Sequence, residues 1–207
     1  MRRSRRCGRG VSDIQGILLA AGAGQRFGQQ KLLHPLPSGE LIGVAAASNL
    51  IKALTNSLAV IRAGDHQLAG RFESLGLRVV ENSQAEQGMG RSLAVGIGAS
   101  IDASGWVVAL ADMPWIASQT ILSVAQALEQ GASLAAPVFR RRRGHPVGFG
   151  HRWRDQLQAL QGDQGARHLL QAHSNELTLL PTDDRAVLLD IDHPNELDPF
   201  SSNSDRL

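Results

Sequence analysis

The sequence predicts one α/β domain in which a mostly parallel sheet lies between two layers of helices. Two observations predict this three-layer α/β/α arrangement. Short apolar segments alternate with helical stretches along most of the 207 residues, a pattern typical of parallel strands joined by crossover helices. The chain also has the length of a single domain with a substantial core, and no linker or internal repeat divides it.

The first half of the chain supplies most of the expected strands. Residues 14–19 form a short apolar run that predicts a first buried strand. The alternation then predicts helices at 41–54, 66–75 and 92–102, and strands at 57–61, 77–80 and 106–110.

The second half predicts a helix at 118–129 and a strand at 133–137, followed by a loop. Later elements are an apolar piece at 147–149, helices near 152–160 and 166–172, and short strands at 177–180 and 187–189. The domain is predicted to span 13–197, between a disordered basic tail at 1–12 and a polar tail at 198–207.

Composition and charge exclude several classes of protein. The apolar content of 43% is ordinary for a globular protein, and no apolar run approaches the roughly 20 residues of a membrane span. The single cysteine, Cys7, excludes an intramolecular disulfide, and the basic N-terminus lacks the apolar core of a secretory signal, so a cytoplasmic location is expected. Five arginines lie in the tail at 1–12, so the net charge of +2 is no argument for nucleic-acid binding.

The segment LAAGAGQRFGQQK, residues 19–31, combines glycines and cations directly after the first strand. Its glycines, among them Gly22 and Gly24, let the backbone turn sharply and approach a ligand closely. Arg26 and Lys31 add two positive charges. Backbone N–H groups and cations together make a binding site for a polyphosphate.

Other glycine-rich motifs fit this segment less well. A dinucleotide-binding fingerprint must open a helix, whereas residues 31–39 contain two prolines and a glycine that forbid a long helix. The Gly-Lys-Ser/Thr ending of a P-loop is also missing. The segment resembles LAAGxGxRxGxxK, the signature loop of sugar-nucleotide and cofactor nucleotidyltransferases. A glycine-rich turn with incidental cations is the alternative.

A carboxylate, Asp112, follows the expected strand at 106–110 in the sequence ALADMP. The ligand crevice of an open α/β sheet lies beyond the carboxyl ends of its strands, so Asp112 and the loop at 19–31 are expected at one edge. A carboxylate beside a polyphosphate needs a cation between them, and Mg²⁺ binds in this way. The alternative is that Asp112 caps the helix beginning near Ile116 or starts an Asp-x-Pro turn.

Two more carboxylates, Asp190 and Asp192, follow the short strand expected at 187–189. In an extended chain the side chains at i and i+2 point to one side, so one of them could supply a second metal ligand. Taken alone, residues 192–195, Asp-His-Pro-Asn, are better explained as a turn.

Three further segments suit the binding of anions. Four arginines at 140–143 precede a tight turn, Gly144-His145-Pro146, and GDQGAR occurs at 162–167. Together they predict a second anion-handling surface, with a mobile basic loop as the alternative for the arginines. The loop EQGMGRS at 86–92 places glycines and a candidate cap, Ser92, at a helix start.

Six motifs occur in order over residues 14–197: LAAGAGQRFGQQK, EQGMGRSL, ALADMP, RRGHPVGF, GDQGARHLL and LLDIDHPNEL. Together they resemble the molybdenum-cofactor cytidylyltransferase branch of the nucleotidyltransferase superfamily, relatives of the molybdopterin-guanine dinucleotide synthases. The resemblance implies a Rossmann-like nucleotidyltransferase fold. The form Ala20-Ala21-Gly22 resembles the CTP-using branch, because the GTP-using branch tends to have Ala-Gly-Gly. Gly24 departs from the serine that relatives often carry.

The resemblance implies three groups of site residues. The catalytic group is Lys31, which neutralises charge at the reacting phosphate, with Arg26 beside it and Asp112, which binds the metal with Asp192 as the preferred second ligand. The nucleotide-binding residues are Leu19, Ala20, Ala21, Gly22, Gly24, Arg26, Lys31, Gly88 and Ser92. The acceptor-binding residues are Arg143, Gly144, His145, Pro146, Asp163 and Arg167.

The implied reaction transfers CMP from CTP to the terminal phosphate of a molybdopterin-type cofactor, with Mg²⁺ as cofactor and pyrophosphate as product. Catalysis would rest on positioning and charge neutralisation. A target molybdoenzyme or its chaperone is a further expected partner, and neither nucleic acid nor a membrane is. Three alternatives stay open: a sibling enzyme using GTP or another acceptor, an oxidoreductase using the loose glycine motif, and a chaperone that holds the cofactor without chemistry.

Overall fold

The computed structural model of the chain describes residues 13–22, 27, 30–163 and 165–200. Within them the strands are β1 (Ile14–Ala20), β2 (Ser57–Arg62), β3 (Arg78–Asn82), β4 (Gly105–Leu110), β5 (Leu134–Phe139), β6 (Arg142–Arg143), β7 (Val147–Gly150) and β8 (Leu177–Pro181). The α-helices are α1 (Ile42–Ala53), α2 (His66–Ser74), α3 (Met89–Gly98), α4 (Ser118–Glu129), α5 (Arg154–Gln158) and α6 (Arg167–Ala172).

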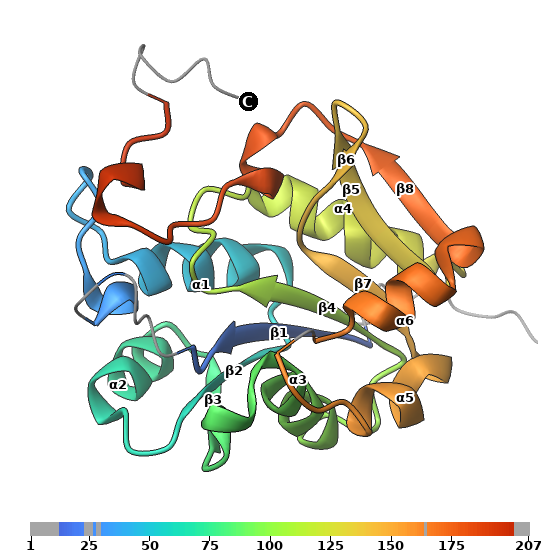
Figure 1. Cartoon of the computed structure of the whole chain (residues 1–207), viewed down its shortest axis with the longest axis horizontal. Helices are drawn as coiled ribbons and strands as arrows, with labels where there is room; N and C mark the ends of the chain where they lie inside the picture. Colours follow the sequence, from blue (N-terminus) through green and yellow to red (C-terminus); the bar gives the residue numbers. More distant parts are fainter. Residues whose placement is uncertain (1–12, 23–26, 28–29, 164, 201–207) are drawn as a thin grey trace, which may run out of the picture.

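The strands form one eight-stranded sheet in the order β3-β2-β1-β4-β7-β5-β6, with β8 paired to β5 (Figure 1). β1 is central and runs parallel to β2 and to β4. β6 and β7 are antiparallel to their neighbours, so the other strands all run in one direction. Their carboxyl ends therefore meet at one edge of a mostly parallel sheet, which confirms the predicted fold class.

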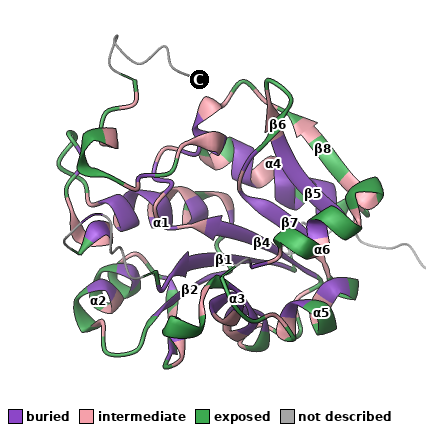
Figure 2. Ribbon diagram, in the orientation of Figure 1, coloured by how far each residue is buried: buried purple, intermediate pink, exposed green. Residues whose placement is uncertain are grey.

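Both faces of the sheet are covered by helices because the strands are apolar on both sides (Figure 2). On β1, Ile14 and Leu18 pack in the layer formed by α1, α2 and α4. Ile17 and Leu19, which alternate with them, pack in the opposite layer with α3, α5 and α6. The central strand is thus held from both sides, and the loop after it starts from a rigid point.

Most predicted elements are confirmed to within three residues, and the absence of a long helix after the signature loop is also confirmed. The chain there forms only the 3₁₀ helix Lys31–Leu33. The helix expected near 152–160 divides into a 3₁₀ helix at His151–Trp153 and the short α5. The predicted tails at 1–12 and 201–207 lie outside the described residues.

Three predictions about local structure are wrong. The expected loop after 137 is instead a hairpin, because β5 continues to Phe139 and pairs with β6 through a turn in which Arg140 and Arg141 have φ of 45° and 65°. The strand expected at 187–189 is a 3₁₀ helix, Arg185–Leu188. The helix expected at 92–102 begins at Met89 and ends at Gly98.

Candidate active site

The signature loop and Asp112 meet at the carboxyl edge because their strands are neighbours. β1 and β4 pair in parallel with Leu19 opposite Leu110, and the Ala111 N–H donates to the Leu19 carbonyl at 3.0 Å. Asp112 is the next residue. It therefore lies beside the end of β1, where the signature loop begins, as the sequence predicts for this edge.

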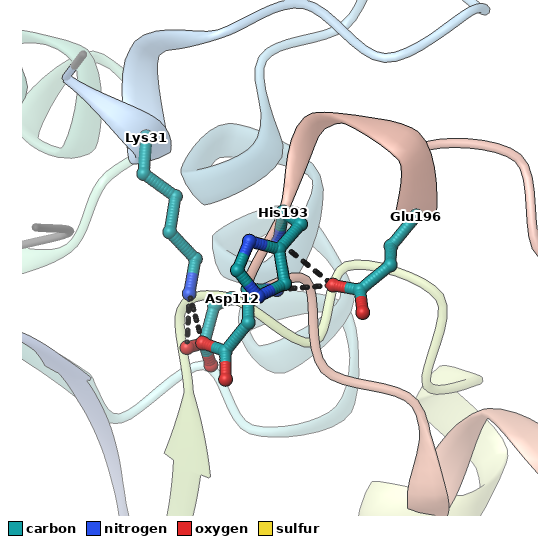
Figure 3. A network of polar contacts seen from close by, with 5 residues as sticks. Lys31, Asp112, His193 and Glu196 are labelled. Atoms are coloured by element: carbon teal, nitrogen blue, oxygen red, sulfur yellow. Dashed lines mark hydrogen bonds and ion pairs between the residues drawn. The ribbon is translucent and has the colours of Figure 1, made fainter. Parts of the chain in front are cut away.

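Lys31 is the centre of a cluster of charged side chains at this edge (Figure 3). Its side chain is only 10% exposed. The Nζ atom donates to Asp112 Oδ2 at 2.8 Å and to Asp192 Oδ1 at 3.3 Å. Two carboxylates from distant parts of the sequence thus contact one cation from a third part. We call Lys31, Asp112 and Asp192 the carboxylate side of the site.

Asp192 reaches this cluster from an extended segment after the 3₁₀ helix Arg185–Leu188. The helix forms because the Asp184 carboxylate accepts from the Ala186 N–H at 3.1 Å. Beyond it, the Ile191 N–H donates to the Asp112 carbonyl at 3.0 Å. The fully buried Ile191 side chain packs with Phe27 of the signature loop. This packing ties the three segments of the cluster together.

Glu196 holds the backbone around Asp192, and sequence reasoning missed it. Its Oε2 atom accepts from the N–H groups of Asp192 at 2.6 Å and of His193 at 2.8 Å (Figure 3). Glu196 is the third residue of a 3₁₀ helix that starts at Pro194, in a capping-box arrangement. A proline followed by a glutamate at this spacing was the signal that could have revealed it.

Asp190 shares the same electrostatic environment. Burial raises its pKa and its own backbone N–H lowers it, while the charges of Asp112 and Asp192 raise it and that of Lys31 lowers it. Among the described residues, the carboxylates in ion pairs with Lys31 are those of Asp112 and Asp192. This contact favours Asp192 over Asp190 as the second metal ligand.

Asp112 does not cap α4, which was one of the two alternative explanations for it. Asp184 fills that position, because its Oδ2 atom accepts from the Ala117 N–H at 3.0 Å and from the Thr120 hydroxyl at 2.7 Å. The carboxylate of Asp112 is instead directed at Lys31.

Three basic side chains, Arg143, His145 and Arg167, form what we call the arginine side of the site. Burial, and then the charge of Arg143, lower the pKa of His145 to about 4, although the charge of Asp112 raises it. Burial, and then the charge of Arg167, lower the pKa of Arg143. Because His145 is within reach of the charges of both Arg143 and Asp112, the arginine side and the carboxylate side adjoin.

The arginine side holds polar groups without partners. The buried Nδ1 atom of His145 has no hydrogen-bond partner among the described residues. No ion pair within the described part of the chain involves Arg143 or Arg167. The structure has a bend at His145 in place of the predicted tight turn, and a Cβ atom on Gly144 would collide with Val187. Arg143 and Arg167 are exposed, and unpaired positive charge on the surface is suited to binding an anion.

Residues 86–92 pack against Gly162 and Asp163. Gly88 has a φ of 96°, and a Cβ atom there would collide with Asp163. The Gly90 N–H donates to the Gly162 carbonyl at 2.8 Å. The glycines of this motif therefore permit close contact between the segment predicted to bind nucleotide and a residue predicted to bind the acceptor.

Ser92 is not the helix cap that the sequence predicts. Gly88 occupies the N-cap of α3, and Ser92 lies inside the helix. Its hydroxyl is buried and accepts a hydrogen bond from Asn82 Nδ2 at 3.0 Å. The residue therefore braces α3 against the end of β3, and its predicted contact with nucleotide stays a prediction.

The remaining residues predicted to bind nucleotide lie at the end of β1 or beyond it. Leu19 and Ala20 belong to the strand, Ala21 is buried directly after it, and Gly22 is exposed. Gly24 and Arg26 fall outside the described residues.

The donor set of the carboxylate side fits a divalent cation only if other ligands join it. In the described part of the chain, no group of three or more His, Cys, Asp or Glu side chains could hold a metal ion. Carboxylate oxygens completed by phosphate oxygens and water are, however, the usual ligands of Mg²⁺. Because Asp112 Oδ2 and Asp192 Oδ1 both contact one nitrogen, at 2.8 and 3.3 Å, the two carboxylates lie side by side at the same edge of the site. Separately, the described residues contain no helix long and apolar enough to cross a membrane.

Several proteins are similar in sequence to this chain over most of its length. Purine catabolism protein PucB of Bacillus subtilis is 30% identical over 88% of this chain and 93% of its own. A molybdenum cofactor guanylyltransferase of Cupriavidus metallidurans is 30% identical over 89% of this chain and 93% of its own. Nicotine blue oxidoreductase of Paenarthrobacter nicotinovorans is 29% identical over 86% of this chain and 92% of its own.

Solved structures share the fold. Rv0371c of Mycobacterium tuberculosis superimposes with a TM-score of 0.78 at 23% identity, covering 90% of this chain and 96% of its own. The same protein in complex with manganese gives a TM-score of 0.75 at 22% identity, covering 88% of this chain and 95% of its own. Residues 16–177, which include the signature loop, Lys31 and Asp112, match the MobA-like NTP transferase domain. The chain therefore belongs to the MobA-like NTP transferase family and is an enzyme of the nucleotidyltransferase type.

Proposed function

We propose that the protein transfers CMP from CTP to the terminal phosphate of a molybdopterin-type cofactor. The observation that carries this proposal is the meeting of the two sides of the site: Lys31 with two carboxylates next to Arg143 and Arg167. One side suits a metal-bound triphosphate and the other suits a second phosphorylated substrate. A family of NTP transferases with molybdenum-cofactor relatives supports the same reaction class.

The proposed reaction needs no strong base. An oxygen of the acceptor phosphate attacks the α-phosphorus of CTP in line and forms a new P–O–P bond. The bond from the α-phosphorus to the bridging oxygen breaks, and pyrophosphate leaves with the electron pair. A phosphate monoester is already an anion at neutral pH, so catalysis is positioning and charge stabilisation.

Lys31 is proposed to bind the phosphates of CTP and to neutralise the charge that develops during transfer. Arg26, which lies outside the described residues, is proposed to assist it. Asp112 and Asp192 would hold Mg²⁺, which supplies Lewis-acid stabilisation of the phosphate oxygens when bound. A related structure in complex with manganese supports a divalent ion in this fold.

The arginine side is proposed to bind the acceptor. Arg143 and Arg167 would hold its phosphate, since neither has an ion-pair partner among the described residues. His145, whose pKa is lowered to about 4, is neutral at pH 7 and would orient the pterin by hydrogen bonding. Gly144, Pro146 and Asp163 would shape the surrounding wall.

The choice of CTP rests on Ala21, which is buried at the end of β1. A methyl group there narrows the space beside the base, and a pyrimidine needs less room than a purine. Steric discrimination of this kind is worth only about 1–3 kcal/mol, so we expect a preference of roughly ten- to a few-hundredfold. GTP is the competing nucleotide, because relatives at 30% identity include a molybdenum cofactor guanylyltransferase.

The test is Mg²⁺-dependent pyrophosphate release with CTP or GTP and the same molybdopterin acceptor. We expect a ratio of kcat/KM for CTP over GTP well above one, and a smaller ratio for Ala21→Gly. A ratio below one in the unmodified protein would overturn the choice of CTP and leave the nucleotidyltransferase assignment intact. Binding of NAD(P)H in the same preparation would favour a redox activity, such as the name of one relative indicates for that protein.

A further proposal concerns the protein that receives the product. A cytidylylated cofactor must be handed on, so a target molybdoenzyme or its chaperone is the expected partner, in the cytoplasm. If the protein were only a carrier of the cofactor, it would bind the acceptor and release no pyrophosphate in this assay.

A further inference from the structure

Lys31 occupies the point at which the two carboxylates of the site converge. Its Nζ atom is 2.8 Å from Asp112 Oδ2 and 3.3 Å from Asp192 Oδ1. The carboxylates are 28% and 42% exposed, whereas the Lys31 side chain is 10% exposed. The ammonium group thus contacts both carboxylates from a side chain that is less exposed than either of them (Figure 3).

The proposed function requires the same ammonium group to bind the phosphates of the nucleotide, away from the carboxylates. Lys31 is to contact the phosphates of the nucleotide, while Asp112 and Asp192 are to hold a divalent cation. An ion bound by the two oxygens that Nζ now contacts, with ligand distances near 2.1 Å, would lie close to the ammonium group and be repelled by its charge. In this respect the inference rests on the proposed function.

The backbone that carries the two carboxylates is held by hydrogen bonds, so we expect Lys31 to be the part that moves. The Ile191 N–H bonds to the Asp112 carbonyl at 3.0 Å, and Glu196 accepts from the Asp192 N–H at 2.6 Å. These contacts hold the backbone of both carboxylates. Lys31 has a flexible four-carbon side chain that can exchange one anionic partner for another.

We propose that Lys31 is a placeholder cation that couples the binding of a divalent metal to the binding of the nucleoside triphosphate. Without nucleotide, the ammonium group of Lys31 would lose its anionic partners if it moved away from the carboxylates. Lys31 therefore stays and competes with the metal for them. With nucleotide, the phosphates accept the ammonium group and add oxygen ligands to the two carboxylates. Each ligand therefore favours the other, by a factor typical of coupled sites, about 5- to 150-fold.

The test measures Mn²⁺ binding to the full chain without nucleotide, from the loss of the free-ion signal in electron paramagnetic resonance. Lys31→Gln removes the competing charge, and we expect it to bind Mn²⁺ at least about tenfold more tightly than the unmodified protein. Lys31→Arg keeps a cation at this place and should bind Mn²⁺ as weakly as the unmodified protein. Lys31→Met, a second neutral variant of similar length, repeats the measurement if Lys31→Gln does not fold.

Lys52→Gln is the matched control. It removes the same charge from an exposed position near the end of α1, so it reports how far net charge alone changes the affinity. We expect a change of less than twofold. An affinity of the neutral Lys31 variants within twofold of the unmodified protein, or an equal gain in Lys52→Gln, would overturn the proposal.

The result is independent of turnover. A gain in Mn²⁺ affinity in the neutral Lys31 variants, together with absent pyrophosphate release by the unmodified protein, would support the placeholder role and refute the transfer reaction. Pyrophosphate release by the unmodified protein, together with unchanged Mn²⁺ affinity in the variants, would support the transfer reaction and refute the placeholder role.

Discussion

The two sides of the site differ in whether their positive charges have ion-pair partners. On the carboxylate side, Lys31 is paired with two carboxylates and its charge is satisfied within the protein. On the arginine side, Arg143 and Arg167 have no ion-pair partner among the described residues, and the pKa of Arg143 is lowered by burial and by the charge of Arg167. Folding thus pairs the cation of one side with carboxylates and leaves the other side with excess positive charge.

This difference indicates how each side responds to a ligand. The carboxylate side must rearrange to bind, since its charges already have partners. The arginine side can take an anion without breaking any ion pair of the described residues, and an anion there relieves the repulsion between the arginines. We therefore expect variants of the carboxylate side to affect the chemical step most, and variants of the arginine side to affect acceptor binding.

The largest effect is expected from the carboxylates. Asp112→Asn and Asp192→Asn should each abolish Mg²⁺-dependent pyrophosphate release, because each removes a charged metal ligand. Circular dichroism should show both variants folded. Substantial turnover in either variant would remove that carboxylate from the metal site, and with it the comparison of a metal side with an anion side.

Lys31→Ala is expected to lower kcat by about two to four orders of magnitude, as for the loss of a charge partner in the transition state. The variant should fold, with some loss of stability because Asp112 and Asp192 lose their ion pairs. Steady-state pyrophosphate release and thermal unfolding are the measurements. Near-normal kcat would mean that the cation serves the resting protein and not the reaction.

The residues behind these predictions differ in how far the sequence reveals them. Lys31 and Asp112 are predictable because each lies beyond the end of an apolar strand, and neighbouring parallel strands bring such residues to the same edge of the sheet. Asp192 is predictable only as one of two candidates, since its register depends on a 3₁₀ helix that Asp184 induces. Glu196 acts on backbone groups through a loop, which no periodic pattern marks.

Local errors in the predicted fold have the same origin. Gly88, with its φ of 96°, starts α3 well before the serine that looked like its cap. The close approach of Asp163 that requires this glycine is long-range and invisible in sequence. The arginine run forms a hairpin although Arg140 and Arg141 must adopt a positive φ, a conformation that residues other than glycine, asparagine and aspartate rarely take. The pairing of β5 with β6 imposes this conformation on the two arginines.

Arg143→Gln tests the arginine side directly. A hydrogen bond to a charged group contributes about 1.5–3 kcal/mol, so KM for the molybdopterin acceptor should rise roughly ten- to a hundredfold with a smaller change in kcat. Arg140→Gln is the matched control, because Arg140 lies at the hairpin turn and its guanidinium stacks 5.3 Å from the Phe139 ring centroid. Equal effects of the two variants would show a diffuse basic surface in place of a defined subsite.

The smallest effect concerns His145 and the dependence of stability on pH. Burial and Arg143 lower the pKa of His145 in the folded protein from 6.5 to about 4. Between these values the unfolded chain binds more protons, so the free energy of unfolding rises with pH. This contribution is complete above about pH 6.5 and is lost as the pH falls toward 4. Between pH 7 and 4.5 the unmodified protein should lose about 1–3 kcal/mol more stability than His145→Gln.

Urea unfolding at several pH values measures this difference, and a nuclear magnetic resonance titration of the His145 ring measures the pKa itself. Arg143→Gln should move that pKa upward, because the arginine charge is the second cause of its depression. Binding of a phosphate monoester at the arginine side should move it in the same direction, since an added anion offsets the arginine charges. A His145 pKa near 6.5 that neither change affects would mean that the arginine side is an ordinary solvated surface, and that the contrast between the two sides is not electrostatic.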